Sequence, residues 1–329
     1  MVTIHITHET TYRHSGPATA AWQMLQLQPR SEPAQECVSF QLEIKPAAPD
    51  LTTRLDYFGN TRHFFSLRES HRELSIISRS TVRRSSEARP LPGITQPLHA
   101  THRQLATLIH SRGQFALEQF LHPTPAVPLL PGAKILADGL DAQTSPLIEW
   151  IAQLGRKFSD HFVFDATATN ISTPLAQVLQ TRRGVCQDFT HLFLSCARQH
   201  GLPAAYVSGY LLTNPPPGQP RLLGADAMHA WASIFVPEVG WVDYDPTNTC
   251  FIGASHVAVA RGRDYTDVSP TRGVFTGGGL HQLKIGVTVE PERVALTHLG
   301  ELPRMHTQSQ NPIHPQLPGP SQRQSQSQS

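Results

Sequence analysis

One cysteine stands where a reactive thiol is expected, at the start of a helical segment. Behind Cys186, apolar residues recur at helical spacing: Phe189, Leu192, Phe193, Cys196 and Ala197. Gly201 and Pro203 follow the stripe, as is typical of a helix C-terminus. The unpaired N–H groups and the positive dipole end of such a helix favour a thiolate at Cys186 and could bind an oxyanion. A free cysteine is more often a small buried hydrophobe, and Cys37, Cys196 and Cys250 are interpreted in that way.

A histidine and an aspartate lie further along, where two strands are expected. Residues 229–237 predict a strand that begins at His229, and residues 240–245 predict a strand that ends at Asp245, before a blocking proline. The turn between them is short enough for a hairpin, which brings the start of one strand beside the end of the next. We therefore expect His229 and Asp245 to hydrogen-bond. His229 would then be the general base and acid for Cys186, and Asp245 would orient the imidazole.

The elements around these residues fall into four regions. Residues 1–88 alternate apolar and polar side chains between turn signals such as Ser15-Gly16-Pro17, which predicts an antiparallel β-sandwich. Residues 89–160 read as a proline-containing linker followed by helices, and residues 161–300 read as the catalytic core. Residues 301–329 are rich in Gln, Ser and Pro, which predicts a disordered tail.

Three helices are expected before the cysteine. The apolar spacing of Leu105, Leu108 and Ile109 predicts the first, and the spacing around residues 147–154 predicts the second. Ser145-Pro146 is interpreted as the N-cap and first-turn pair of the second helix. A third helix is expected over residues 174–180.

No metal or cofactor site is predicted. His191, Cys196 and His200 could be imagined as ligands, because Cys196 and His200 are four residues apart, but His191 lies on another face of the helix and no carboxylate accompanies them. A calcium-binding loop pattern is not visible. The run Gly277-Gly278-Gly279 lacks the Lys-Ser/Thr of a phosphate-binding loop and is interpreted as a turn.

Composition limits the partners and the compartment. The chain has 329 residues, with 27 Lys and Arg against 25 Asp and Glu, so a net charge of +2 does not favour a nucleic-acid partner. The first residues lack the apolar run of a signal peptide, and no segment reaches the roughly 20 apolar residues of a membrane span. Four widely spaced cysteines without a C-x-x-C pair predict reduced thiols. We expect a cytoplasmic protein without a membrane partner, and the oligomeric state stays open.

Several segments in order carry a family resemblance. RRGVCQDFTH, YVSGYL, DAMHAWASIFVPEVGW and DYDPTN together resemble the transglutaminase-like superfamily, over about residues 162–248. The first ninety residues and the stretch 262–289 resemble the bacterial branch with a β-rich N-terminal region. The resemblance implies a papain-like α+β core with Cys186, His229 and Asp245 as its triad. Gln180 stands six residues before the cysteine, where papain-type proteases place an oxyanion glutamine, although a solvated helix-surface glutamine explains it more simply.

The implied reaction is cysteine-dependent acyl transfer on amide or peptide bonds through a thioester, with a protein or peptide as substrate. Water as acceptor makes the protein a protease or amidase, and we favour this reading because the bacterial members look protease-like. An amine as acceptor makes it a protein-glutamine transglutaminase. The third reading, from another class, is a binding or scaffold protein whose triad is vestigial.

Overall fold

The computed structural model describes residues 1–85, 95–112, 115–213 and 226–292. The strands are β1 (Val2–Leu25), β2 (Gln35–Lys45), β3 (Thr52–Leu55), β4 (Thr61–Leu67), β5 (His71–Arg84), β6 (Val163–Phe164), β7 (Arg183–Gly184), β8 (Ala204–Leu211), β9 (Met228–Val236), β10 (Gly240–Asp245), β11 (Cys250–Phe251), β12 (His256–Gly262), β13 (Thr271–Gly277) and β14 (His281–Pro291). The helices are α1 (Leu98–Arg112), α2 (Phe115–Glu118), α3 (Pro131–Ala137), α4 (Leu147–His161), α5 (Leu175–Thr181), α6 (Cys186–Gln199) and α7 (Tyr265–Val268). The tail predicted at residues 301–329 lies outside the described residues.

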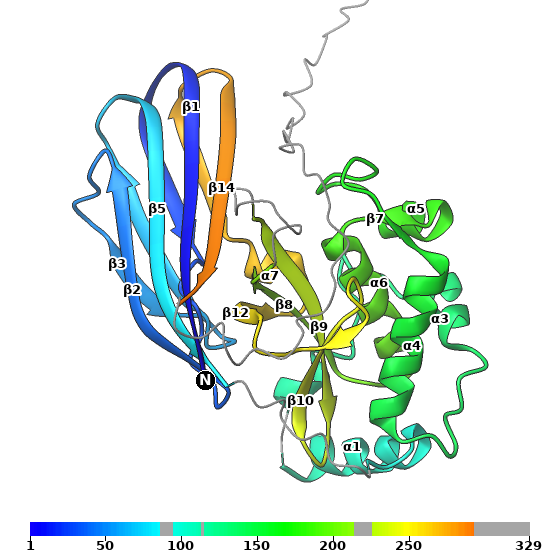
Figure 1. Ribbon diagram of the computed structural model, residues 1–329. Coiled ribbons are helices and arrows are strands. Elements are labelled where there is room, and N and C mark those ends of the chain that lie inside the picture. The colour runs from blue at the N-terminus through cyan, green and yellow to red at the C-terminus, as the bar shows by residue number, and fades with distance from the viewer. Residues whose placement is uncertain (86–94, 113–114, 214–225, 293–329) are drawn as a thin grey trace, which may run out of the picture.

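One long strand organises the N-terminal half. β1 pairs with β5 and β14 along its first part and with β4 and β13 along its second part, all antiparallel. The result is a seven-stranded sheet with the central order β2-β5-β1-β4-β3. It folds over its own core, which contains Tyr12, Leu25, Phe65, Leu74 and Ile76. Figure 1 shows this sheet as the blue and orange half of the molecule.

The turn expected at Ser15-Gly16-Pro17 is wrong, because β1 continues through these residues. Partners from the far end of the chain hold the segment extended: Ser15 N donates to Leu280 O at 2.8 Å, and Gly16 N donates to Gly278 O at 2.9 Å. The pairing with β5 only shifts register between Arg13 and Ala18. Long-range pairing thus overrides the local turn preference of Gly-Pro.

Two strands of this sheet come from the C-terminal part of the described chain. β13 and β14 pair with β1, whereas the sequence assigned them to the catalytic core at residues 161–300. The first and last parts of the described chain therefore build one sheet together. The local sequence of β14 does not identify the strand that pairs with it, because the alternation of apolar and polar residues predicts a strand but not its neighbour in the sheet.

The other half of the molecule contains a five-stranded antiparallel sheet in the order β11-β10-β9-β8-β12. α6 packs against β8 and β9, and α3, α4 and α5 pack around α6 (Figure 1). Trp150, Phe158, Leu192 and Phe193 are among the buried residues of this core. Pro146 is the N-cap residue of α4, so the cap expected at Ser145 is wrong by one position. None of the helices in the described part of the chain is long and apolar enough to cross a membrane.

Candidate active site

Cys186 is the first residue of α6, as the apolar stripe predicts. β7, which pairs in parallel with β6, ends at Gly184, two residues before the cysteine. Gly184 is required there, because a Cβ at this position would lie 2.7 Å from Oδ2 of Asp188. That oxygen accepts hydrogen bonds from Val185 N at 2.9 Å and from Thr169 Oγ1 at 2.6 Å. The entry into α6, and with it the position of the thiol, is therefore held by buried polar contacts.

His229 and Asp245 lie together at one end of the five-stranded sheet. β9 and β10 form an antiparallel hairpin in which Tyr244 pairs with Ala232, so the two functional groups stand near the open end. Nε2 of His229 lies 2.6 Å from Oδ2 of Asp245. The carboxylate is fully buried, and the side chain of His229 is only 10% exposed. This is the contact that the hairpin predicted.

Five donors converge on the Asp245 carboxylate. Oδ1 accepts the backbone N–H groups of Thr247 at 2.9 Å and of Asn248 at 3.1 Å. Oδ2 accepts from His229, from Nδ2 of Asn248 at 2.6 Å and from Nε2 of His256 at 3.2 Å. Burial alone would raise the pKa of Asp245, but the two histidines outweigh it and hold that pKa well below the usual range. Asp245 is therefore a buried carboxylate that stays ionised.

The thiol and the imidazole also interact. Burial lowers the pKa of His229, whereas the charge and hydrogen bond of Asp245, followed by a hydrogen bond with Cys186, raise it by more. The net effect is a histidine pKa above its ordinary value. Because Nε2 is bonded to Asp245, Nδ1 is the ring nitrogen left to face the sulfur. An imidazole beside Cys186 can take up the proton of the thiol, and the thiolate is the reactive form of cysteine.

The other cysteines lie in environments that keep a thiol protonated. Cys196 is fully buried, its Sγ lies 2.9 Å from Ala133 O, and burial raises its pKa far above the ordinary value. Burial and then the charge of Asp245 raise the pKa of Cys250 to about 12, and burial raises the pKa of Cys37. Gln180 lies exposed in the last turn of α5, which suits a solvated glutamine, and its oxyanion role stays a prediction.

Three residues around the site were not assigned a role from the sequence. Asp188 lies in the helix that begins at Cys186, and Asn248 lies in the segment DYDPTN. The sequence gives neither residue a specific partner. His256 begins a strand that no motif links to Asp245. Each of these roles depends on contacts across the fold, which spacing along the chain does not reveal.

Two groups of side chains contain possible metal ligands, the one named from the sequence and a second one at the site itself. His191 Nε2 accepts from Tyr265 N at 3.2 Å, and the Cys196 sulfur bonds to α3, so the two are engaged separately. In the part of the chain that the structure describes, His229, Asp245 and His256 form the group whose ligand atoms lie within 4.8 Å of one another. Their atoms are already joined by hydrogen bonds through one carboxylate oxygen. A metal ion would have to replace those bonds, so the arrangement suits proton sharing better.

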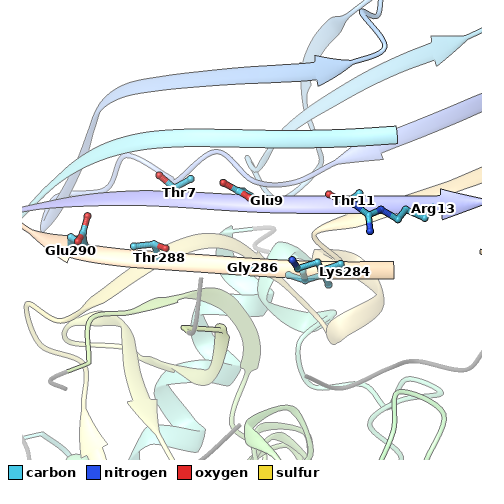
Figure 2. Close-up of a pocket in the computed structure, with 9 residues that line it drawn as sticks. Thr7, Glu9, Thr11, Arg13, Lys284, Gly286, Thr288 and Glu290 are labelled. Atoms are coloured by element: carbon cyan, nitrogen blue, oxygen red, sulfur yellow. The ribbon is translucent and has the colours of Figure 1, made fainter. Parts of the chain in front are cut away.

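A separate hollow of about 430 Å³ lies on the N-terminal sheet (Figure 2). Its lining comes from β1 and β14 and mixes acidic and basic groups, including Glu9, Arg13, Lys284 and Glu290. Gly286 sits opposite Glu9 and contributes no side chain to fill the space. No cysteine or histidine lines this hollow, so the chemistry of Cys186 does not extend to it.

Both halves of the chain resemble known protein families. A family model described as the bacterial transglutaminase-like N-terminal region matches residues 4–83, and one described as the transglutaminase-like superfamily matches residues 134–246. An uncharacterised protein of Mycobacterium tuberculosis is 37% identical over 87% of this chain and 92% of its own length. A protein-glutamine gamma-glutamyltransferase of Pseudomonas aeruginosa is 29% identical over 36% of this chain and 18% of its own length.

The fold has a solved counterpart. The crystal structure of a candidate cysteine protease from Cytophaga hutchinsonii matches with a TM-score of 0.65 at 16% identity, over 88% of this chain and 90% of that chain. The likeness confirms the predicted α+β fold with a papain-like core and an N-terminal β region. Together with the matching family models and the mycobacterial relative, it leads to one conclusion: the chain belongs to the transglutaminase-like superfamily and carries the bacterial transglutaminase-like N-terminal region.

Proposed function

We propose that the protein is a cysteine-dependent acyl-transfer enzyme that acts on amide or peptide bonds, with Cys186 as nucleophile, His229 as general base and acid, and Asp245 as the orienting carboxylate. One observation carries the proposal. The 2.6 Å hydrogen bond between His229 and the buried, ionised Asp245 occurs on the same histidine that interacts with Cys186. A vestigial site would not need to keep a buried carboxylate charged, since burying a charge is costly.

The reaction follows from these positions. The Cys186 thiolate attacks the carbonyl carbon and forms a C–S bond, and the N–H groups in the first turn of α6 stabilise the oxyanion. The tetrahedral intermediate collapses, the C–N bond breaks, and His229 gives its proton to the departing amine. His229 then takes a proton from the acceptor that attacks the thioester. The C–S bond breaks, and the thiolate–imidazolium pair is restored.

Water is the acceptor that we favour, which makes the protein a protease or amidase acting on proteins or peptides, in the cytoplasm. No calcium-binding pattern is visible in the sequence to switch on amine transfer. The second candidate is a protein-glutamine transglutaminase. It is favoured by the partial similarity to the Pseudomonas aeruginosa protein whose name carries that activity.

A peptide-library digest with and without an added primary amine tests the proposal. Cleaved peptides or deamidated glutamines, with products identified by mass, are expected from the wild type and not from Cys186→Ala. Amine-tagged glutamines would show that transglutamination is the reaction instead. Turnover that persists in Cys186→Ala would overturn the assignment of the nucleophile.

A further inference from the structure

A second histidine contacts the carboxylate of the candidate triad from the opposite side. His256 is 2% exposed, and its Nε2 lies 3.2 Å from Oδ2 of Asp245. The same oxygen accepts the 2.6 Å hydrogen bond of His229. The two imidazoles are 6.1 Å apart between ring centroids, so they flank one carboxylate oxygen. Rotation of Asp245 away from His229 would break the contact with His256 at the same time.

The protonation state of His256 makes it a donor. Burial lowers its pKa, although the hydrogen bond and charge of Asp245 oppose this, and the charges of His229 and Arg84 lower it further. The ring is therefore neutral, and because it faces a carboxylate, Nε2 carries the proton. Nδ1 is then free to accept from Oγ of Ser255, 3.2 Å away. Both ring nitrogens have a partner, which sets the tautomer.

The ring is also held in place by its surroundings. The indole of Trp231 packs edge-on against it at 5.4 Å between centroids. His256 begins β12, the edge strand of the five-stranded sheet, and the N-terminal sheet bonds directly to that edge. Arg30 N donates to Ala258 O at 3.0 Å, and Gln35 bonds to both backbone groups of Ala258. The position of His256 thus depends on both halves of the molecule.

We propose that His256 is a positioning residue, which holds Oδ2 of Asp245 in the orientation that His229 needs. This inference rests on the proposed function, because it assigns a role within the same site. It also gives the N-terminal region a structural role in the site, because this region holds β12, and β12 carries His256. His256 acts through Asp245, and no step of the acyl transfer passes through its ring.

The test compares two amide variants with matched polarity. The amide of His256→Gln reaches the position of Nε2 and restores a donor to Asp245. The amide of His256→Asn reaches only the position of Nδ1 and leaves Asp245 without that donor. Iodoacetamide labelling of Cys186 from pH 4 to pH 9, resolved by peptide mapping, reports on the thiolate–imidazolium pair without any substrate. His191→Gln is the control, since His191 is an equally buried histidine whose ring bonds to Tyr265 and not to the triad.

We expect the acidic limb of the labelling profile to move up by about one pH unit in His256→Asn, with a roughly tenfold slower reaction at pH 5.5, because a misplaced orienting group weakens the pair. His256→Gln and His191→Gln should follow the wild type. If the acidic limb of His256→Asn coincides with that of the wild type, the positioning role alone is overturned. Equal shifts of the limb in His256→Asn and His256→Gln would overturn it as well. A wild type that labels like an ordinary exposed thiol would overturn the proposed function and the inference with it.

Discussion

Gln35 and Ala258 exchange two hydrogen bonds across the boundary between the two sheets. Nε2 of Gln35 donates to Ala258 O at 2.8 Å, and Ala258 N donates to Oε1 of Gln35 at 2.8 Å. Asn60 does the same for Arg261, with both distances 2.8 Å. Two side-chain amides thus replace the neighbouring strand that β12 lacks at the edge of its sheet. An unsatisfied edge invites pairing with other chains, and these contacts close it.

Replacing Gln35 by leucine should destabilise the protein strongly. Gln35→Leu leaves the buried N–H of Ala258 without a partner, which costs about 1–3 kcal/mol, whereas Ala258 O keeps the hydrogen bond from Arg30 N. We expect the free energy of unfolding in urea to fall by about 1–3 kcal/mol. Gln41→Leu, at an exposed position of the same strand, should stay within about 0.5 kcal/mol of the wild type. Equal effects of the two substitutions would contradict the role given to the amide.

The two cysteines of α6 should separate activity from stability. Cys186→Ala removes the nucleophile at a half-buried helix start and should abolish turnover with little change in unfolding. Cys196→Ala removes a buried sulfur and should cost about 1 kcal/mol while activity per folded molecule is retained. The measurements are product formation and urea denaturation on the same preparations. An essential Cys196 with a dispensable Cys186 would reverse the assignment.

The parts of the site that the sequence predicts are those with a short-range signal. The stripe behind Cys186 specifies its own helix, and the hairpin brings His229 to Asp245 because the connecting turn is short. The fold class follows in the same way from strand alternation and helical spacing. Each of these predictions depends on residues that lie close together along the chain.

The features that were missed depend on contacts between distant segments. Ser15-Gly16 stays extended only because residues 278 and 280 bond to it, and no local pattern carries that information. β9 and β8 lie between β10 and β12 in the sheet, so the contact of His256 with Asp245 forms only when the whole sheet has assembled. The sequence places residues 1–88 in a region of their own for the same reason, since nothing along the chain links the amides of Gln35 and Asn60 to β12.

Substitution of His229 should reduce the reaction rate more than substitution of Asp245, whereas substitution of Asp245 should reduce the stability more. His229→Ala removes the base, and general acid–base catalysis is worth about 10²–10⁴-fold, so turnover should fall by about 10³-fold, and labelling of Cys186 at neutral pH should slow to the rate of an ordinary thiol. Asp245→Asn keeps an acceptor for the imidazole and should lose less rate. It should nevertheless unfold more easily than His229→Ala, because its new NH₂ group faces N–H donors on either side of the buried site. Equal losses of rate in the two variants would count against the separate roles.

The raised pKa of His229 predicts a pH-dependent contribution to stability. Its pKa lies above the ordinary value of 6.5 in the folded protein, chiefly because Asp245 outweighs the effect of burial. Such a group stabilises the folded state fully below its unfolded pKa and loses that contribution as pH rises through its folded pKa. The gap in unfolding free energy between wild type and His229→Gln should therefore narrow from pH 6 to pH 9. In an Asp245→Asn background the narrowing should disappear, and a gap that widens with pH would contradict the ionic pairing.

Gly155 in α4 should not tolerate alanine, although alanine is the better helix former by about 1 kcal/mol. A Cβ at Gly155 would overlap the hydroxyl and ring of Tyr244, which is buried on β10 directly before Asp245. Overpacking of this kind costs about 1–3 kcal/mol or more, so we expect Gly155→Ala to lower the free energy of unfolding despite its helix propensity. Displacement of Tyr244 should also shift Asp245 and slow the labelling of Cys186.

Gly132→Ala in α3 is the control, because its Cβ would meet only the flexible end of Leu179, at 2.7 Å, and should leave the labelling rate unchanged. A Gly155→Ala protein that is more stable than the wild type would show that β10 and α4 pack less tightly than the structure indicates.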